Sequence, residues 1–537
     1  MNRLSIIGNL MDMGMKISQT KDLIKNFYLG DQIPWVIGYS GGKDSTTTTQ
    51  LVVESLIELR DSGEQLHKKV YIISSDTLVE TPMIKNIIHN NIGNINKLSN
   101  KFQLPIEAHI VAPKVDQTFW VNVIGRGYPT PNQTFRWCTD RMKIDPANRF
   151  IMDVVDQFGE AIMVLGVRDG ESNSRDRVLQ SHTVAGHQLM RHTTMPNAYV
   201  FAPIRNFTID DVWNYLLAGD TPWGTKNDEL YKLYSESSNE CPLVIDKNIK
   251  NEAGSCGNSR FGCWVCTVVK EDKSLTGYIN SGEEWLRPML SFRNWLYSIR
   301  DSENLRMHKR SNGSLYFSKI MTNSDGSLLI PEKTGRQKTI LKKAKNGWYD
   351  QNDVEWHVFE SNNSEYDAKE YISTNKIDLS SGENPRIIIK NHNDEYMRLG
   401  NGPYTLEARK EILKRLLKVQ EEVGENELYK VEELLEIRKI WLQHGDWEDC
   451  LPKIYFDITG KILQIDDYVS FFSDEDMKII YSTCVNNDFD FSTYNSLISL
   501  SKEYVGLNNR NEIQKKIQSV MSKEFLVVEN FGEVNED

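Results

Sequence analysis

The chain has 537 residues, of which 39% are hydrophobic and 26% charged, and its formal net charge is −12. A single core stops growing at about 250–300 residues, so the length predicts two or three domains, and the apolar content excludes wholesale disorder. The negative net charge argues against a protein that binds nucleic acid by itself, because contacts of Lys and Arg with phosphates normally dominate the affinity for nucleic acid. The sequence has no apolar run long enough for a membrane span and no signal-peptide pattern, so we expect a cytoplasmic protein without membrane contact.

A glycine turn between a buried strand and a helix is the first strong signal. Residues 34–39 form a short apolar run, and helical spacing begins at Ser45. The turn itself consists of Ser40, Gly41, Gly42, Lys43, Asp44 and Ser45. Two glycines let the backbone turn tightly and point successive N–H groups at one spot, where a helix N-terminus adds its dipole. The hexapeptide therefore predicts an anion cradle, although its spacing is not that of the Walker loop.

Each polar side chain of this turn suits the binding of a nucleotide. Lys43 can neutralise phosphate charge, and Ser40 and Ser45 can donate hydrogen bonds to phosphate oxygens. Asp44 can hold Mg²⁺ directly or through water. We therefore predict that this turn binds phosphate together with Mg²⁺.

Further apolar runs follow at residues 70–73, 107–111 and 161–167 and alternate with helical patterns. This alternation predicts an α/β fold with a parallel twisted sheet and flanking helices, whose ligands gather at the carboxyl ends of the strands. Arg168 follows the last run directly, where its fork-shaped cation suits a phosphate. By itself, Arg168 could equally form a structural ion pair with Asp169 or Glu171.

Four of the seven cysteines lie within a short glycine-rich segment. They are Cys241, Cys256, Cys263 and Cys266, and the last two form a C-x₂-C pair. Such a cluster predicts a thiol-bound metal rather than unrelated structural cysteines, but the spacing does not distinguish zinc from iron–sulfur. Cys450 and Cys484 have no ligand-like neighbours, so we interpret both as structural.

Cys138 lies apart from this cluster in a basic segment, residues 135–143. Three flanking cations should favour its thiolate, which predicts a reactive group. It could be a fourth cluster ligand, a persulfide carrier in catalysis or a packing residue. The flanking cations could touch a nucleic-acid phosphate or form a solvated face.

The pattern predicts three parts: a nucleotide domain at residues 1–235, a Cys-rich cluster lobe at 236–320, and a mixed α+β C-terminal region at 321–537. Within the last part, residues 323–401 indicate a loop-rich region with short strands. Amphipathic helices are expected from Thr405 and from Val431. This C-terminal region could dock partners.

About residues 30–220 resemble the PP-loop ATP pyrophosphatases, and among them the phosphoadenylylsulfate reductase-like superfamily. The resemblance rests on the hexapeptide and on Ser75-Asp76-Thr77 with Glu80-Thr81, Gly166 to Ser172 with Arg175, and Pro203 to Phe207 followed by Asp211 to Tyr215. It implies an adenine nucleotide alpha hydrolase-like fold with a nucleotide lying across the strand ends. It also implies that Asp76 lies near the ribose or adenine, and Arg168 and Arg175 near phosphates.

The whole chain is similar to the DndC family of sulfurtransferases from bacterial DNA phosphorothioation systems, through its length, the Cys256 to Cys266 segment and Gly402 to Glu407. This similarity implies a 4Fe–4S cluster and cleavage of ATP to AMP and pyrophosphate, with Lys43 and Asp44 as catalytic residues. It further implies DNA as a substrate within a multi-protein phosphorothioation complex, and a cysteine desulfurase as sulfur donor.

Three other functions stay open at this stage. The same turn could serve thiolation of tRNA or of a small molecule. A phosphoadenylylsulfate reductase-like enzyme is less expected, because the Glu-Cys-Gly context near the C-terminus is missing and Glu240-Cys241-Pro242 lies mid-chain. From another class, the chain could be a zinc-stabilised nucleic-acid-binding scaffold with a nucleotide-sensing loop.

Overall fold

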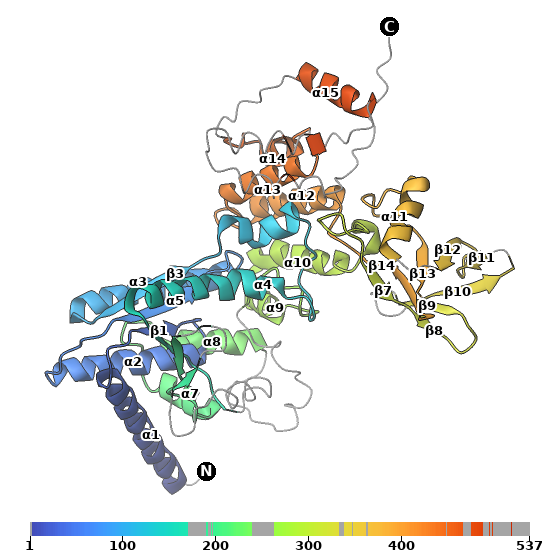
Figure 1. Ribbon diagram of the computed structural model, residues 1–537. Coiled ribbons are helices and arrows are strands. Elements are labelled where there is room, and N and C mark those ends of the chain that lie inside the picture. The colour runs from blue at the N-terminus through green and yellow to red at the C-terminus, as the bar shows by residue number, and fades with distance from the viewer. Residues whose placement is uncertain are drawn as a thin grey trace. The chain divides into compact units, whose positions relative to one another are not determined.

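The computed structural model describes residues 3–169, 197–238, 262–331, 338–360, 364–391, 393–465 and 474–486, without residues 346 and 447, and a few shorter pieces (Figure 1). The chain divides into two compact units. The first comprises Met1–Thr118 and Pro131–Leu290, and the second Phe119–Thr130 and Ser291–Asp537. The boundary after Leu290 falls inside the predicted lobe of residues 236–320. Residues 119–130, expected in the first domain, belong to the second unit.

The first unit is built on a mostly parallel sheet. Its described strands have the order β3-β2-β1-β4-β6-β5. Their bounds are β1 Trp35–Gly38, β2 Val70–Ser75, β3 Ile106–Val111, β4 Ala161–Val164, β5 Met190–Arg191 and β6 Ala198–Phe201. All neighbours pair in parallel except the edge strand β5, which runs antiparallel to β6. The predicted parallel sheet is confirmed, and β1 to β4 lie where the four apolar runs predict strands.

Helices pack on both faces of this sheet, which explains why its central strands are apolar on both sides. They include α1 Arg3–Leu29, α2 Lys43–Asp61, α3 Pro82–Phe102, α4 Trp137–Thr139, α5 Asp145–Phe158, α7 Ile209–Leu217 and α8 Asn227–Ser238. Successive strand residues point to opposite faces. Val36 and Tyr71 pack on one face with Ile151 of α5. On the other face Trp35 contacts Tyr28 of α1, with ring centroids 5.7 Å apart.

The strand order reverses between β1 and β4. The chain moves from β1 outward through β2 to β3 and then returns to the other side of β1. Ligands of open parallel sheets bind at such a reversal, outside the carboxyl ends of the strands. The segments that follow β1 and β4 approach closely here, since a Cβ added to Gly166 would lie 2.5 Å from the backbone oxygen of Asp44. Position 166 therefore has no room for a side chain.

The second unit contains a larger sheet than the sequence predicts. Its described strands have the order β7-β14-β13-β12-β11-β10-β9-β8. Their bounds are β7 Phe317–Lys319, β8 Met321–Thr322, β9 Leu328–Pro331, β10 Lys338–Ala344, β11 Gly347–Tyr349, β12 Glu355–Glu360, β13 Ile387–Lys390 and β14 Tyr396–Leu399. Only β12 and β13 pair in parallel among these strands, and α11 Ser364–Thr374 lies between them in the chain. The short strands and polar turns explain why the composition indicated loops.

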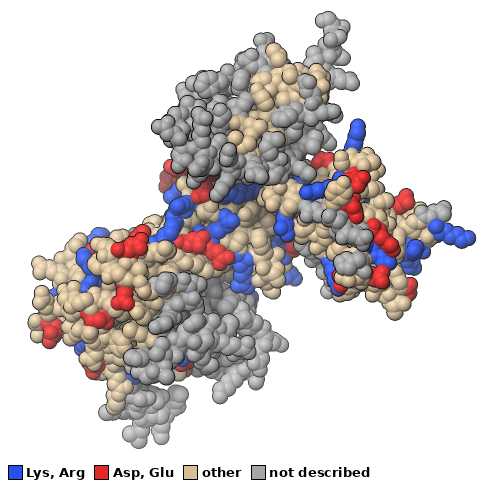
Figure 2. All heavy atoms as spheres, viewed as in Figure 1, with Lys and Arg blue, Asp and Glu red and all other residues tan. Residues whose placement is uncertain are grey.

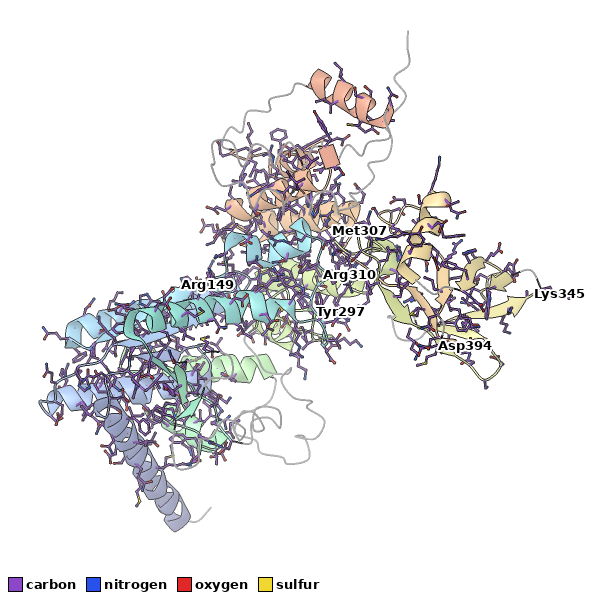
Figure 3. All side chains as sticks on the ribbon, viewed as in Figure 1. Arg149, Tyr297, Met307, Arg310, Lys345 and Asp394 are labelled. Carbon is purple, nitrogen blue, oxygen red and sulfur yellow. The ribbon has the colours of Figure 1, made fainter. Side chains whose placement is uncertain are left out.

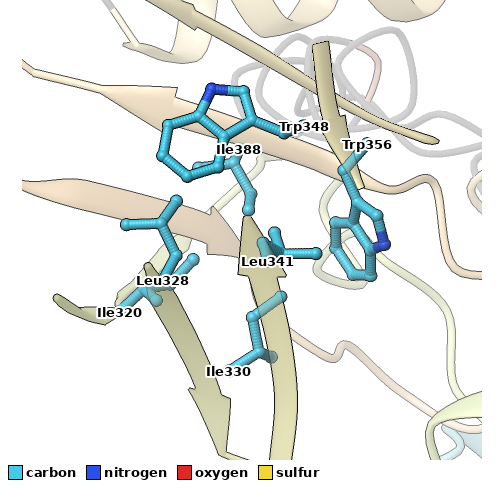
Figure 4. Packing of buried hydrophobic residues seen from close by; sticks show 7 residues of the cluster. All are labelled: Ile320, Leu328, Ile330, Leu341, Trp348, Trp356 and Ile388. Carbon is cyan, nitrogen blue, oxygen red and sulfur yellow. The ribbon is translucent and has the colours of Figure 1, made fainter. Parts of the chain in front are cut away.

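An apolar cluster forms the core of this sheet (Figure 4). Its members are Ile320, Leu328, Ile330, Leu341, Trp348, Trp356 and Ile388. Outside the cluster, Figure 2 shows cations and carboxylates interspersed over the sheet. One example is Lys390, whose Nζ lies 2.7 Å from the carboxylate of Asp394, a residue that Figure 3 labels. Exposed pairs of this kind contribute little to stability, so burial of apolar side chains stabilises the sheet more than these pairs do.

Helices complete the second unit, together with the segment 119–130. They include α12 Leu406–Val423, α13 Val431–Gln443, α14 Cys450–Thr459 and α15 Asp474–Asn486. Thr405 caps α12 as predicted, with its side chain accepting from the N–H of Ala408 at 3.2 Å. Trp441 of α13 donates from Nε1 to the carbonyl of Ile124 at 2.8 Å. Among the described helices, none has the length and apolarity needed to cross a membrane.

The close approach at Gly166 predicts opposite effects for two glycine substitutions. In Gly166→Ala the new methyl group would push against the Asp44 backbone, and overpacking of this kind costs about 1–3 kcal/mol. Gly93 lies inside α3, where an added Cβ would meet nothing within 4 Å outside its helix. Gly93→Ala should stabilise the protein by up to about 1 kcal/mol, because alanine favours a helix interior. Thermal unfolding should therefore give a lower Tm for the first variant only, and equal shifts would contradict the close approach.

Candidate nucleotide and thiol site

The glycine turn lies between β1 and α2, as predicted. Gly41 has a φ of +71°, in the left-handed region that favours glycine. Hydrogen bonds between Ser40 and Ser45 link the two ends of the turn. Their Oγ atoms lie 3.0 Å apart, and the N–H of Ser40 donates to Ser45 Oγ at 3.2 Å. The N–H of Gly42 donates to Ser40 Oγ at 3.4 Å. The backbone is thus bent around the start of α2 in the form that an anion cradle requires.

Asp44 lies between two cations at this turn. Lys43 Nζ donates to Asp44 Oδ2 at 2.8 Å, and Arg168 Nε donates to Asp44 Oδ1 at 2.6 Å. The three side chains are largely buried, with exposed fractions of 14% for Lys43, 15% for Asp44 and 9% for Arg168. The sequence left a local pairing of Arg168 with Asp169 open, but Asp169 instead accepts from Arg205 Nε at 2.9 Å. The structure therefore brings together three of the predicted site residues.

This arrangement of charges suits a magnesium-bound polyphosphate. Carboxylate oxygens are preferred Mg²⁺ ligands, so Asp44 can exchange its cationic partners for the metal ion. Lys43 and Arg168 can then exchange the carboxylate for phosphate oxygens, and guanidinium suits a planar pair of oxygens. Each charged group of the site would keep a partner of opposite sign, which avoids the cost of an unpaired buried charge.

Asp76 begins the loop that follows β2, and it is buried. Its Oδ1 accepts from the N–H of Leu78 at 2.7 Å, and its Oδ2 lies 3.1 Å from His89 Nε2. Burial alone would raise the pKa of Asp76, but hydrogen bonds from Glu80, Leu78 and His89 together lower it. Burial and the bond to Asp76 raise the pKa of Glu80 to about 7. Glu80 thus titrates at a higher pH than an ordinary carboxyl, and this effect of burial is not visible in the sequence motif that contains Glu80.

The C-x₂-C segment packs on this same loop. The N–H of Trp264 donates to the carbonyl of Val79 at 3.0 Å, and Cys263 forms an antiparallel bridge with Glu80. The buried Thr77 lies with its Oγ1 3.3 Å from Cys263 Sγ. Backbone and side chain together therefore fix Cys263 against the loop that carries the predicted ribose or adenine contact.

Cys138, in the short helix α4, interacts electrostatically with Cys266, and Lys143 interacts with Cys138, Cys263 and Cys266. Burial, followed by Cys266, raises the pKa of Cys138, and burial raises the pKa of Cys263 to about 12. The expectation that flanking cations favour a Cys138 thiolate is wrong, because burial outweighs the lowering effect of Lys143. The structure does bring this cysteine to the C-x₂-C pair, although they lie more than a hundred residues apart.

Cys241, Cys256 and Arg175 lie outside the described residues, so their predicted roles stay predictions. Within the described ranges, no group of three or more His, Cys, Asp and Glu is arranged to hold a metal ion. Cys138, Cys263 and Cys266 nonetheless supply soft sulfur donors, the type that zinc and iron–sulfur clusters use. The donor chemistry therefore fits a thiol-bound metal.

A family model and a curated protein each match part of this sequence. The family model of the phosphoadenosine phosphosulfate reductase domain matches residues 34–269. An uncharacterized protein of Methanocaldococcus jannaschii is 23% identical over 247 residues, which are 46% of this chain and 39% of that protein. The match thus spans about two fifths of the length of that relative.

Solved structures are also similar to this chain at low identity. Phosphoadenylyl-sulfate reductase from Candida auris, in a phosphate complex, is 13% identical and covers 40% of this chain and 85% of its own, with a TM-score of 0.26. The U34-tRNA thiolase of Methanococcus maripaludis, solved with its 4Fe–4S cluster, is 12% identical and covers 53% and 79%, with a TM-score of 0.25. The residues that match the family model, 34–269, include the strands of the parallel sheet. This part of the chain is therefore similar in sequence to the phosphoadenosine phosphosulfate reductase domain.

Proposed function

We propose that this chain is an ATP pyrophosphatase and sulfurtransferase that activates a backbone phosphate of DNA for sulfur incorporation. The observation that carries the proposal is the loop of residues 76–80. It follows β2 at the carboxyl edge of the sheet that also carries the glycine turn, and it holds Cys263 by backbone and side-chain contacts. This arrangement supports a site that combines nucleotide chemistry with thiol chemistry, as an ATP-dependent sulfur transfer would need.

In the first step, ATP binds with its β and γ phosphates in the turn from Ser40 to Ser45. An anionic oxygen of the substrate phosphate attacks the α-phosphorus, and pyrophosphate leaves with the electrons of the broken P–O bond. The attacking oxygen is already ionised, so the step requires no general base. Lys43 and Arg168 would neutralise the charge that develops on the phosphates, while Asp44 would hold Mg²⁺. Positioning and charge neutralisation thus account for catalysis of the adenylation.

In the second step, a sulfur nucleophile attacks the activated phosphorus, a P–S bond forms, and AMP leaves. A cysteine desulfurase would supply the sulfur. It would arrive as a Cys138 persulfide, whose S–S bond an external thiol then reduces, or as sulfide that an external thiol has already released from the persulfide of the desulfurase. Cys241, Cys256, Cys263 and Cys266 would hold a 4Fe–4S cluster, which when bound would supply iron–sulfur chemistry for this transfer. Lys143 lies among the described thiols and would favour their anionic forms.

The charge of the chain bears on its substrate. A net charge of −12 does not favour the binding of DNA by this chain alone. We therefore propose that a basic partner within a multi-protein phosphorothioation complex supplies most of the DNA affinity, and that the second unit is the docking region for such partners.

Replacing Lys43 should abolish the first step. Lys43→Ala removes a cation that contacts the phosphates, and loss of one such stabilising group costs about 10²–10³ in rate. Pyrophosphate release by the anaerobically purified protein is the measurement. The exposed Lys69, paired with Glu107 on the same unit, provides a matched control. Lys69→Ala should retain activity, and unchanged turnover in Lys43→Ala would refute the assignment.

Two cysteine substitutions should separate metal binding from sulfur transfer. Cys263→Ser should lose iron and acid-labile sulfide, because it removes a predicted ligand. Cys138→Ser should keep both, and keep pyrophosphate release, but lose the formation of phosphorothioate linkages. Cys450→Ser, in the second unit, is the control and should change none of these readouts. Loss of iron in Cys138→Ser would make this residue a ligand, whereas an unchanged product yield would make it a packing residue.

The rival functions give different products. Thiolation of tRNA or of a small molecule would leave DNA without phosphorothioate linkages, as product analysis would show. A colourless protein that holds zinc, and not a brown one with bleachable absorbance, would support the scaffold instead.

A further inference from the structure

A tyrosine distant in the sequence contacts the glycine turn. The N–H of Lys43 donates to Tyr234 Oη at 3.3 Å, and Lys43 Nζ lies 5.5 Å from the centroid of the Tyr234 ring. The hydroxyl also lies against Gly42, where an added Cβ would be only 3.1 Å from it. A neutral oxygen from α8 therefore accepts a backbone hydrogen bond that the turn would otherwise direct to an anion.

Aromatic packing fixes the position of this tyrosine. The ring of Tyr234 meets Trp213 of α7 edge-on, with centroids 5.2 Å apart and planes at 81°. Trp213 is fully buried and also contacts Tyr231 at 5.4 Å. Thr208 and Asp211 form a capping box at the start of α7, which fixes this helix. The Asp211 to Tyr215 motif, interpreted from the sequence as structural, thus supports a residue of the nucleotide turn.

We propose that Tyr234 competes with the nucleotide polyphosphate for the Lys43 N–H and so sets the affinity of the turn. The inference rests on the proposed function, because it requires that the turn binds phosphate. A phosphate oxygen at hydrogen-bond distance from this N–H would overlap the tyrosine hydroxyl, so one oxygen must replace the other. An anionic phosphate oxygen accepts a stronger hydrogen bond than a tyrosine hydroxyl, so polyphosphate displaces the hydroxyl. The hydrogen bond between the Lys43 N–H and Tyr234 is lost in the exchange, which reduces the net free energy of binding. Tyr234 is thus a positioning residue that lowers ground-state affinity.

The test measures binding of magnesium pyrophosphate to the full chain by calorimetry. Tyr234→Phe removes the hydroxyl and keeps a ring of the same shape against Trp213. It should bind pyrophosphate about 2–10-fold more tightly than the wild type, the factor that corresponds to one typical hydrogen bond. The KM for ATP in pyrophosphate release should fall by a similar factor, which a purely structural role would not produce. Tyr231→Phe, on the same tryptophan, is the matched control and should change the Kd less than twofold.

Each other outcome has a distinct meaning. Unchanged or weaker pyrophosphate binding by Tyr234→Phe, with the wild type binding normally, would overturn the competition while leaving the proposed function intact. Absence of pyrophosphate binding in both proteins would instead refute phosphate binding by the turn. The unfolding temperature of each variant, measured without pyrophosphate, verifies that it is folded.

Discussion

The ion pair between Arg168 and Asp44 joins the two halves of the parallel sheet. Arg168 follows β4 and Asp44 begins α2 after β1, so the pair spans the point where the strand order reverses. The pair is largely buried, and removal of either partner would leave a charge whose desolvation is not compensated. Gly166 makes the geometry attainable, because the backbones meet where any side chain would collide. The placement of Lys43 and of the whole glycine turn follows from this contact.

The loop of residues 76–80 is a second connection between distant segments at the same edge of the sheet. Asp76 is held by the N–H of Leu78 and by His89, while Thr77 and Glu80 contact Cys263. A shift of this loop would therefore move the Asp76 carboxylate and the Cys263 thiol together. Such a short, internally bonded loop is better suited to couple two chemical steps than a flexible connection, because it limits the independent motion of the two groups.

The sequence predicts most of the nucleotide half and much less of the thiol half. Apolar runs are local signals strong enough to place β1 to β4. The glycine turn and the end of the last run are sufficient to place Lys43, Asp44 and Arg168. Cys138 and Tyr234 instead reach the site through long-range packing, which no local pattern encodes. The basic neighbours of Cys138 suggested a reactive thiolate. Burial instead raises the pKa of Cys138, and the sequence does not show this burial. The short strands between residues 317 and 399 were hidden by polar turns, since each strand contributes only a few apolar residues to a shared cluster.

The contacts of the turn also bear on how it would use binding energy. The N–H groups of Gly42 and Lys43 donate to Ser40 and Tyr234, and the Lys43 ammonium donates to Asp44. A polyphosphate would therefore exchange partners at each of these positions, and the net gain per exchange is about 1 kcal/mol or less for neutral groups. The negative charge of the phosphates makes the exchange of partners favourable. This charge increases as the bond between the α-phosphorus and pyrophosphate breaks. Binding that is modest for ATP and stronger for the transition state raises the rate of the step, whereas equally tight binding of both would not.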